Sequence, residues 1–191
     1  MEKEFEDLLR AKLSPEAVTL TLTRAGCFLS AYELIKSEVV EKVHQFFWRG
    51  FQDGQHVYDE ERYRQTVLFR SPKSKYRASC AWLVEMGALT AEQVATLEQI
   101  QEHRQEIAHE LPKLLIDPTF DVRADLLVAA VEIVRKLGVF WGSIEVDTSA
   151  EWDGKEVDYE GIKSGSYLLM DYLLVIAELS PDADKQAEPV P

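Results

Sequence analysis

Apolar residues recur every three or four positions through most of this chain, and this spacing restricts its fold more than any other feature. The longest such run lies between about 26 and 51 and indicates a helix with one wide apolar face. Other helical runs lie at about 2–12, 75–86, 90–111, 121–140 and 165–179. The sequence therefore predicts an all-α fold, a bundle of four or five main helices in a single domain over 1–179.

Capping and breaking residues mark the ends of these helices. Ser14-Pro15 is typical of a helix start, Thr90 with Gln93 forms a capping box, and Gly87 is placed to end the helix before it. Two segments lack a clear period: a polar excursion at about 52–76, and an acidic stretch at about 143–164, expected to be a loop or a small hairpin. The Pro-rich and charged residues 180–191 are expected to be a disordered tail.

Composition limits the classes of function. The formal net charge of −13 repels phosphate and argues against a broad nucleic-acid-coating surface, while leaving room for a local basic site. The chain starts without a secretory pattern, and its most apolar stretch, Tyr167 to Leu179, is too short to span a bilayer. Cys27 and Cys80 lie among apolar residues and are expected to be buried thiols. We expect a cytoplasmic protein with no membrane contact.

The helix expected after Thr90 carries an unusual charge in its apolar stripe. The stripe runs in steps of three and four through Leu97, Ile100, Arg104, Ile107 and Leu111. Arg104 therefore stands where a leucine is expected, and a guanidinium there needs a carboxylate, a phosphate or an interface edge. An internal ion pair and a binding role both satisfy that need.

His109 lies five residues after Arg104, near the end of the same helix, because Pro112 disturbs the helix beyond it. The helix dipole favours a cation in the last turn, and an imidazole is suited to proton transfer near neutral pH. On an ideal helix, side chains five positions apart diverge by about 140°. The two side chains would meet at one phosphate only if the helix bends or if a second copy supplies half of the site.

Residues 104–109, Arg-Gln-Glu-Ile-Ala-His, resemble the R-x-x-x-x-H signature of the HEPN superfamily, helical-bundle proteins that include many prokaryotic toxin and phage-defence ribonucleases. The helix around 29–36 and the Glu110-Leu111 pair after the motif are also similar to that family, and the resemblance covers roughly 20–180. One position departs from the pattern. The residue after the arginine is usually Asn, Asp or His in the family, and here it is Gln105.

The resemblance implies a metal-independent endoribonuclease that acts as a homodimer, with no cofactor and with RNA as its substrate. His109 would act on the 2′-hydroxyl or the leaving oxygen, while Arg104 and Gln105 would hold the scissile phosphate. An antitoxin or a defence-system protein is the further partner that the resemblance implies. Because some members of the family are non-catalytic, a helical interaction or RNA-binding protein stays open as the alternative.

A basic strip without any acidic residue lies between positions 62 and 77. It consists of Arg62, Arg64, Arg70, Lys73, Lys75 and Arg77. Tyr63, Phe69 and Tyr76 are interleaved with these cations, a composition that suits unpaired RNA through phosphate contacts and base stacking. Pairing of these cations with the chain's own acids is the competing interpretation.

A second alternative is a di-metal carboxylate bundle. Glu41/His44 and Glu106/His109 are both E-x-x-H pairs, which helical spacing places on one face. Such a centre needs two further carboxylates from other helices, for which Glu33, Glu85 and Glu132 are candidates. Phosphate-cradling glycine loops, hydrolase elbows and C-x-x-C motifs are absent from the sequence.

Overall fold

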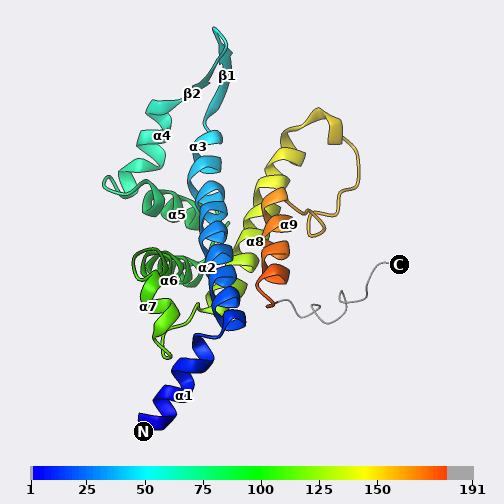
Figure 1. The fold of residues 1–191 in the computed structure, drawn as a ribbon. Coiled ribbons are helices and arrows are strands. Elements are labelled where there is room, and N and C mark those ends of the chain that lie inside the picture. Colours follow the sequence, from blue (N-terminus) through cyan, green and yellow to red (C-terminus); the bar gives the residue numbers. More distant parts are fainter. Residues whose placement is uncertain (1, 180–191) are drawn as a thin grey trace. The chain divides into compact units, whose positions relative to one another are not determined.

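The computed structural model describes residues 2–179, so the tail predicted at 180–191 lies outside the described residues. In chain order the elements are α1 (Glu2–Lys12), α2 (Pro15–Lys36), the π-helical stretch η1 (Ser37–Glu41), α3 (Lys42–Gln45), β1 (Trp48–Gln52), β2 (Gln55–Tyr58), α4 (Glu60–Thr66), the 3₁₀ turn η2 (Leu68–Arg70), α5 (Lys75–Glu85), α6 (Ala91–His109), α7 (Leu111–Ile116), α8 (Ala124–Thr148), the 3₁₀ turn η3 (Ala150–Trp152) and α9 (Gly165–Ile176) (Figure 1). The prediction of an all-α fold is confirmed, and one two-stranded sheet is its only addition within residues 2–179.

The predicted caps act where the sequence places them. Ser14 Oγ accepts a hydrogen bond from the Ala17 N–H at 3.2 Å, and α2 begins at Pro15. Thr90 and Gln93 form the reciprocal capping box before α6, with bonds of 3.2 and 2.9 Å. Because these side chains satisfy backbone donors that a helix start leaves unpaired, they fix where each helix begins.

The helical run expected over 26–51 ends early, and this part of the prediction is wrong. Regular helix gives way to the π-helical stretch η1, α3 stops at Gln45, and Trp48 begins the strand β1. Asp53 and Gly54 both have positive φ (52° and 78°), which is the geometry of the tight turns that join antiparallel strands. The aromatic residues around this point fit a strand as well as a helix, so the turn decides the outcome.

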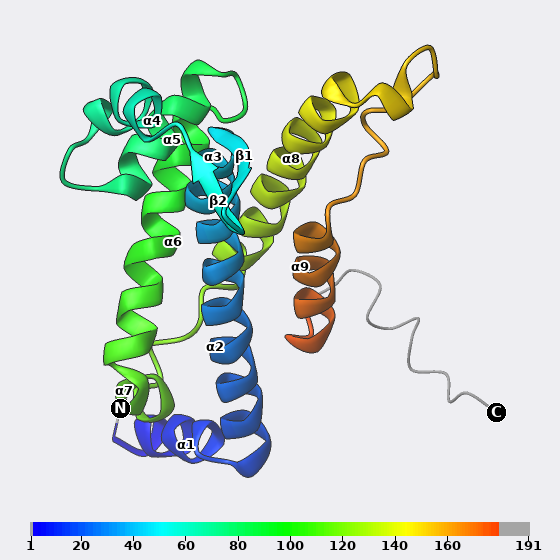
Figure 2. The same ribbon diagram turned by 90° about the horizontal axis from the view of Figure 1, so that it is seen from above.

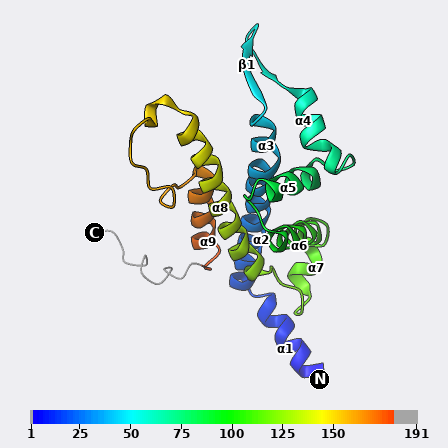
Figure 3. The same cartoon turned by 180° about the vertical axis from the view of Figure 1, so that it is seen from behind.

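β1 and β2 form an antiparallel hairpin that follows directly from the end of α3 (Figures 1 and 3). Trp48 pairs with Tyr58 and Phe51 pairs with His56, with an irregularity between Trp48 and Gly50. The polar excursion expected at about 52–76 therefore contains the strand β2, the helix α4 and the turn η2.

The acidic stretch at about 143–164 holds no hairpin, and most of it is a loop. α8 continues through its first residues to Thr148, and η3 follows. The loop then packs closely on α8 at two glycines: a Cβ on Gly138 would lie 2.6 Å from Ser164 Oγ, and one on Gly142 would lie 2.6 Å from Ile162. The two glycines are four residues apart, so they open one face of α8 to the returning chain.

The contacts divide the chain into two compact units. Unit 1 contains the described residues of 1–32, 96–131 and 168–191, and unit 2 contains 33–95 and 132–167. The single-domain organisation over 1–179 stays a prediction. Unit 1 buries Phe28, Leu97, Ile100, Ile107, Leu127 and Met170. Unit 2 buries Ile35, Val39, Val43, Leu83 and Leu137.

Both cysteines are free thiols buried in these cores, Cys27 in unit 1 and Cys80 in unit 2, as expected. Burial raises the pKa of the Cys27 thiol, which lowers its reactivity. None of the helices in residues 2–179 is long and apolar enough to cross a membrane.

Candidate functional site

The R-x-x-x-x-H motif lies on the last two turns of α6, in unit 1. α6 stays regular to its end, because the Glu110 N–H donates to the Glu106 carbonyl at 2.7 Å before the backbone turns into α7. Gln105 and His109 are both exposed. They are four residues apart, so they share one solvent-facing side of the helix. This side can bring an amide and an imidazole to the same ligand.

Arg104 lies at the edge of that side and is half-buried. Its guanidinium is 5.4 Å from the ring centroid of Tyr32, a cation–π contact with a buried residue of α2. Ala108, one turn further along, is exposed and short, so the side of Arg104 that faces away from Tyr32 is not crowded by its own helix.

His103, not Arg104, fills the core position of the stripe, which corrects the sequence prediction. His103 is 4% exposed, and its ring meets Phe28 edge to face at a centroid distance of 5.0 Å. The buried stripe of α6 therefore runs through Leu97, Ile100, His103 and Ile107.

Both ring nitrogens of His103 are hydrogen-bonded. The Arg123 N–H donates to Nε2 at 3.0 Å, so Nδ1 carries the proton and donates to Glu106 Oε2 at 2.8 Å. Arg123 is itself held by Asp125 through bonds of 3.2 and 2.5 Å, and the Arg123 hydrogen bond holds the pKa of the Asp125 carboxyl below its usual range. His103 thus ties α6 to the chain entering α8, which is a structural role.

One copy of the chain does not aim Arg104 and His109 at a common point. Because α6 remains a regular helix up to His109, the bend that would let the two side chains converge is absent. Glu106 and Glu110 are exposed within three residues of His109, and Glu102 is exposed about two turns earlier on the same helix. These carboxylates repel a phosphate, so a phosphate bound here needs cations from beyond this turn of the helix.

The predicted basic strip lies on α4, η2 and the start of α5, in unit 2. Arg64 pairs with Glu61 at 2.8 Å. Arg70 is only 13% exposed in its side chain, pairs with Glu85 and lies over the Phe69 ring at 4.6 Å. Arg62, Lys73, Lys75 and Arg77 are exposed. Arg64 and Arg70 are therefore paired within the chain, and the side chains of Arg62, Lys73 and Lys75 reach solvent.

The stacking partners predicted for this strip are only partly available. Tyr63 is 2% exposed, and burial raises the pKa of its hydroxyl, so it belongs to the core of unit 2. Phe69 is exposed, but Arg70 covers one face of its ring. The prediction that Tyr63 stacks on bases is wrong, because the helical period of α4 turns it inward.

The exposed aromatic surface lies instead on the hairpin, outside the residues that the sequence predicts for RNA binding. Trp48 and Phe51 are 47% and 65% exposed, although both are large apolar side chains. His56 lies 4.2 Å from Phe51 and 6.2 Å from Trp48, measured between ring centroids. Aromatic residues on both sides of an Asp53-Gly54 turn pair are the signal that marks this surface in the sequence.

Two open hollows flank Tyr58. The hairpin hollow has a volume of about 430 Å³ and is lined by Gln45, Trp48, His56 and Tyr58. The helix hollow has a volume of about 300 Å³ and is lined by Val40, Glu41, His44, Gln45, Tyr58, Tyr63 and Lys75. In the latter, the His44 ring stacks on Tyr58 at 4.3 Å and pairs with Glu60 through Nε2 at 2.8 Å. Gln45 and Tyr58 line both hollows.

The residues of the di-metal alternative are engaged elsewhere. Glu41 accepts a hydrogen bond from Ser37 Oγ at 2.9 Å, His44 pairs with Glu60, and Glu106 pairs with His103. Among residues 2–179, no group of three or more His, Cys, Asp or Glu side chains is placed to hold a metal ion. The geometry of the described residues does not favour this alternative.

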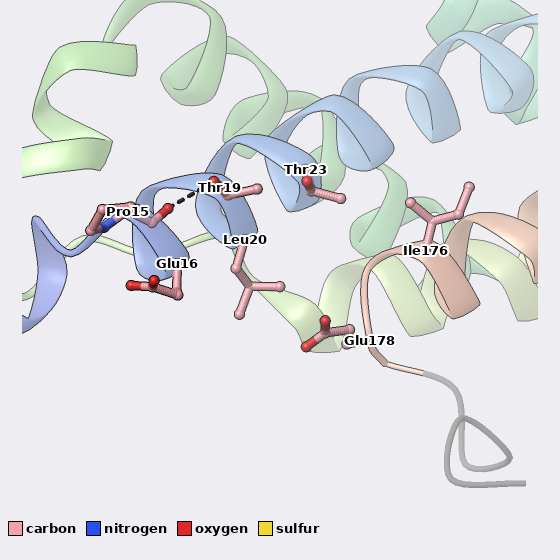
Figure 4. Close-up of a pocket in the computed structure, with 7 residues that line it drawn as sticks. All are labelled: Pro15, Glu16, Thr19, Leu20, Thr23, Ile176 and Glu178. Atoms are coloured by element: carbon pink, nitrogen blue, oxygen red, sulfur yellow. Dashed lines mark hydrogen bonds between the residues drawn. The ribbon is translucent and has the colours of Figure 1, made fainter. Parts of the chain in front are cut away.

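A further pocket, in unit 1, has a volume of about 370 Å³ between the first turns of α2 and the end of α9. Figure 4 shows Thr19 and Thr23 on α2, with Glu16 and Glu178 among the lining residues. Thr19 Oγ1 is occupied by a hydrogen bond to the Pro15 carbonyl at 2.7 Å. The charged side chains that line the pocket are both acidic, so it is unsuited to a phosphate.

Comparison of this chain with known protein families, with curated proteins and with solved structures finds no match.

Proposed function

We propose that this chain is a metal-independent endoribonuclease of the HEPN type that acts as a homodimer. The observation that carries the proposal is the arrangement at the end of α6: His109 and Gln105 share an exposed side, with Arg104 at its edge in the R-x-x-x-x-H order. These groups supply a proton-transfer base and hydrogen-bond donors for a phosphate, which are the parts that RNA cleavage without a metal requires.

The reaction uses the ribose 2′-hydroxyl as its nucleophile. His109 removes the proton from this hydroxyl, O2′ attacks phosphorus, and the bond from phosphorus to O5′ breaks. The proton needed by the leaving O5′ comes from the His109 of a second copy. Arg104 binds the non-bridging oxygens through its planar donor fork, and Gln105 donates from its amide. The products are a 2′,3′-cyclic phosphate and a 5′-hydroxyl, so no oxidant, reductant or metal enters the balance.

A dimer supplies what a single α6 lacks. Two copies that meet near the ends of α6 bring two arginines and two histidines to one phosphate and offset the local acidic charge of Glu102, Glu106 and Glu110. Exposed apolar side chains stand close to this end. α7 follows His109 directly and exposes Leu111 and Ile116, and α1, which lies beside α7 (Figure 2), exposes Phe5 and Leu8. Apolar side chains of this kind are suited to the core of a protomer interface.

The test is cleavage of a labelled RNA by the purified chain in the presence of EDTA. We expect His109→Ala and Arg104→Ala each to lower the cleavage rate by at least about 100-fold, the usual effect of losing a proton-transfer or charge-stabilising group. Arg135→Ala is the matched control, because Arg135 on α8 pairs with Glu132 at the surface and lies outside the motif. Circular dichroism checks that Arg104→Ala still folds without its contact to Tyr32. Cleavage that survives both substitutions would refute the proposal.

A non-catalytic RNA-binding protein of the same type is the second candidate. The observation that favours it is the negative charge of three exposed glutamates on the last turns of α6, together with Gln105 in place of a shorter polar residue. This candidate predicts RNA binding without cleavage in the same assay, both with EDTA and with added Mg²⁺. The antitoxin or defence-system partner stays a prediction in either case.

A further inference from the structure

The hairpin holds a cluster of aromatic side chains that the core does not use. Trp48, Phe51 and His56 are exposed, and their ring centroids lie within about 6 Å of one another, as the 5.8 Å separation of Trp48 and Phe51 illustrates. Burying large aromatic rings is strongly favourable, so leaving several of them together in water is unusual for a stable surface. The cluster therefore needs a functional explanation.

These rings are held in place before any ligand arrives. The Asp59 N–H donates to the Phe47 carbonyl at 2.8 Å and closes the base of the hairpin. Arg49 on β1 pairs with the Asp59 side chain, and the Asp53-Gly54 turn closes the other end. A preformed platform loses little conformational entropy on binding, which favours a planar ligand that stacks.

The hairpin hollow matches a nucleobase in shape and in chemistry. Its walls are the rings of Trp48, His56 and Tyr58, and His56 and Tyr58 are close to parallel, with an interplanar angle of 26°. Gln45 contributes an amide that both donates and accepts hydrogen bonds, as the edge of a base requires. A volume of about 430 Å³ leaves room for one base and part of its ribose.

The helix hollow, which shares Gln45 and Tyr58 with the hairpin hollow, provides a cation for a phosphate. Lys75 lines it and, within residues 2–179, forms no ion pair. One carboxylate, Glu41, also lines this hollow and accepts a hydrogen bond from Ser37, while Glu60 pairs with His44, so Lys75 is the group there that can hold a phosphate. A base in the hairpin hollow and its adjacent phosphate in the helix hollow would be consecutive groups of one nucleotide strand.

We infer that the hairpin and the end of α3 form a binding site for an unpaired nucleobase of a single-stranded RNA, with Trp48 and Tyr58 stacking on the base, Gln45 meeting its edge and Lys75 holding the adjacent phosphate. The choice of RNA over DNA rests on the proposed function, whereas the stacking site does not. A duplex is excluded as the preferred ligand, because its base faces are covered by neighbouring base pairs.

The experiment measures fluorescence anisotropy of a labelled single-stranded RNA 12-mer in EDTA. The His109→Ala background keeps the RNA intact during the measurement. We expect Trp48→Ala and Gln45→Ala to weaken binding, the former by about tenfold or more. Lys75→Ala should weaken binding at low salt. It should also lower the slope of log K against log salt concentration by about one, the effect of losing one phosphate contact. Gln45 lies at the end of α3 and outside both strands, so this variant reports on the site even if Trp48→Ala disturbs the hairpin.

Trp152→Ala is the matched control, because Trp152 is an exposed tryptophan that lines neither hollow. Duplex RNA of the same sequence should bind several-fold more weakly than the single strand. A mononucleotide such as AMP should compete only at far higher concentration than the strand.

The inference is overturned if the 12-mer does not bind, if the Trp48 and Gln45 variants bind as the control does, if the duplex binds equally well, or if AMP alone binds as tightly as the strand. Failure of the proposed function gives a different result. Wild-type protein then binds the 12-mer through Trp48 and Gln45 but does not cleave it.

Discussion

His103 occupies the place in the core of α6 that the apolar spacing assigns to Arg104. Steps of three and of four are both compatible with a helix, so the spacing alone leaves the stripe uncertain by one residue at each step. The structure resolves this ambiguity through Phe28, against which the His103 ring packs, and through the Arg123 N–H that the ring accepts. No feature of the sequence near His103 predicts its hydrogen bond with the Arg123 N–H, twenty positions away. At the residue scale, the motif is visible in the sequence, whereas the packing around it could not be predicted.

His103→Ala should destabilise the protein by about 2–4 kcal/mol, because it removes a buried ring and leaves the Arg123 N–H without its acceptor. The measurement is equilibrium unfolding in urea. Gln105→Ala, two positions along the same helix and exposed, is the control and should change the free energy of unfolding by less than about 0.5 kcal/mol. Equal stability of the two variants would contradict the role assigned to His103.

Glu38 is a second residue whose burial could not be predicted from the sequence. It is fully buried in the π-helical stretch η1, and Lys42 Nζ lies 3.1 Å from its Oε1. Lys42→Met should destabilise the protein by about 3–5 kcal/mol, because it strands a buried carboxylate. Adding Glu38→Gln should recover much of that loss in a double-mutant cycle. Lys36→Met, which breaks the exposed pair with Glu33, should cost no more than about 1 kcal/mol, and a similar cost for Lys42→Met would disprove this account.

The helices follow from the sequence more completely than the hairpin does. Ser14 and Thr90 accept hydrogen bonds from backbone N–H groups at the starts of their helices, and Gly87 adopts the positive φ that ends α5. The hairpin could not be predicted, because the aromatic residues before Asp53 continue the helical period of the preceding run and do not alternate as in a regular strand. The two positive φ angles at Asp53 and Gly54 decide between these interpretations, and the exposed aromatic site depends on that decision.

Asp59 links the hairpin to α4, and its titration gives a pH prediction. The side-chain hydrogen bond from Arg49, followed by the bond from the Arg62 N–H, holds the pKa of this carboxyl below its usual range. A depressed pKa in the folded state stabilises the protein above the ordinary carboxyl value, and this contribution is lost as the pH falls through the lower, folded value. Asp59→Asn should therefore be less stable than wild type at pH 7, and the difference should shrink in acid.

Urea unfolding of both proteins from neutral pH to about pH 3, below the ordinary aspartate value, measures this difference. Asp171→Asn, at an exposed position on α9, is the control and should follow wild type throughout. A difference between Asp59→Asn and wild type that grows in acid would contradict the assignment.

At the scale of the whole molecule, the sequence predicts that two copies of the chain are needed to form one site. Five residues apart on a regular helix, the side chains of Arg104 and His109 point in different directions, and α6 is regular to its end. The surface that would bring two copies together could not be predicted, because it depends on α1 lying beside α7 and on which of their apolar side chains stay exposed. Two fixed residues identify the motif, but tertiary contacts determine its surroundings.

The proposed dimer should be visible in solution as a mass near twice the 21.8 kDa of one chain. Leu8→Asp and Ile116→Asp, which place a charge on the exposed apolar side chains of α1 and α7, should shift the protein to the monomer and lower the cleavage rate per chain by about tenfold or more. Light scattering coupled to gel filtration measures the mass. Leu22→Asp, at an exposed leucine on α2, is the control and should remain dimeric. Full cleavage by a monomeric variant would contradict a shared site.

The central claim is RNA cleavage through the 2′-hydroxyl by Arg104 and His109 without a metal, and the product ends test it most directly. Wild-type protein in EDTA should produce fragments with a 2′,3′-cyclic phosphate and a 5′-hydroxyl, and should leave intact an RNA whose scissile ribose lacks the 2′-hydroxyl. Fragments with 5′-phosphates, or cleavage of the 2′-deoxy strand, would contradict the account.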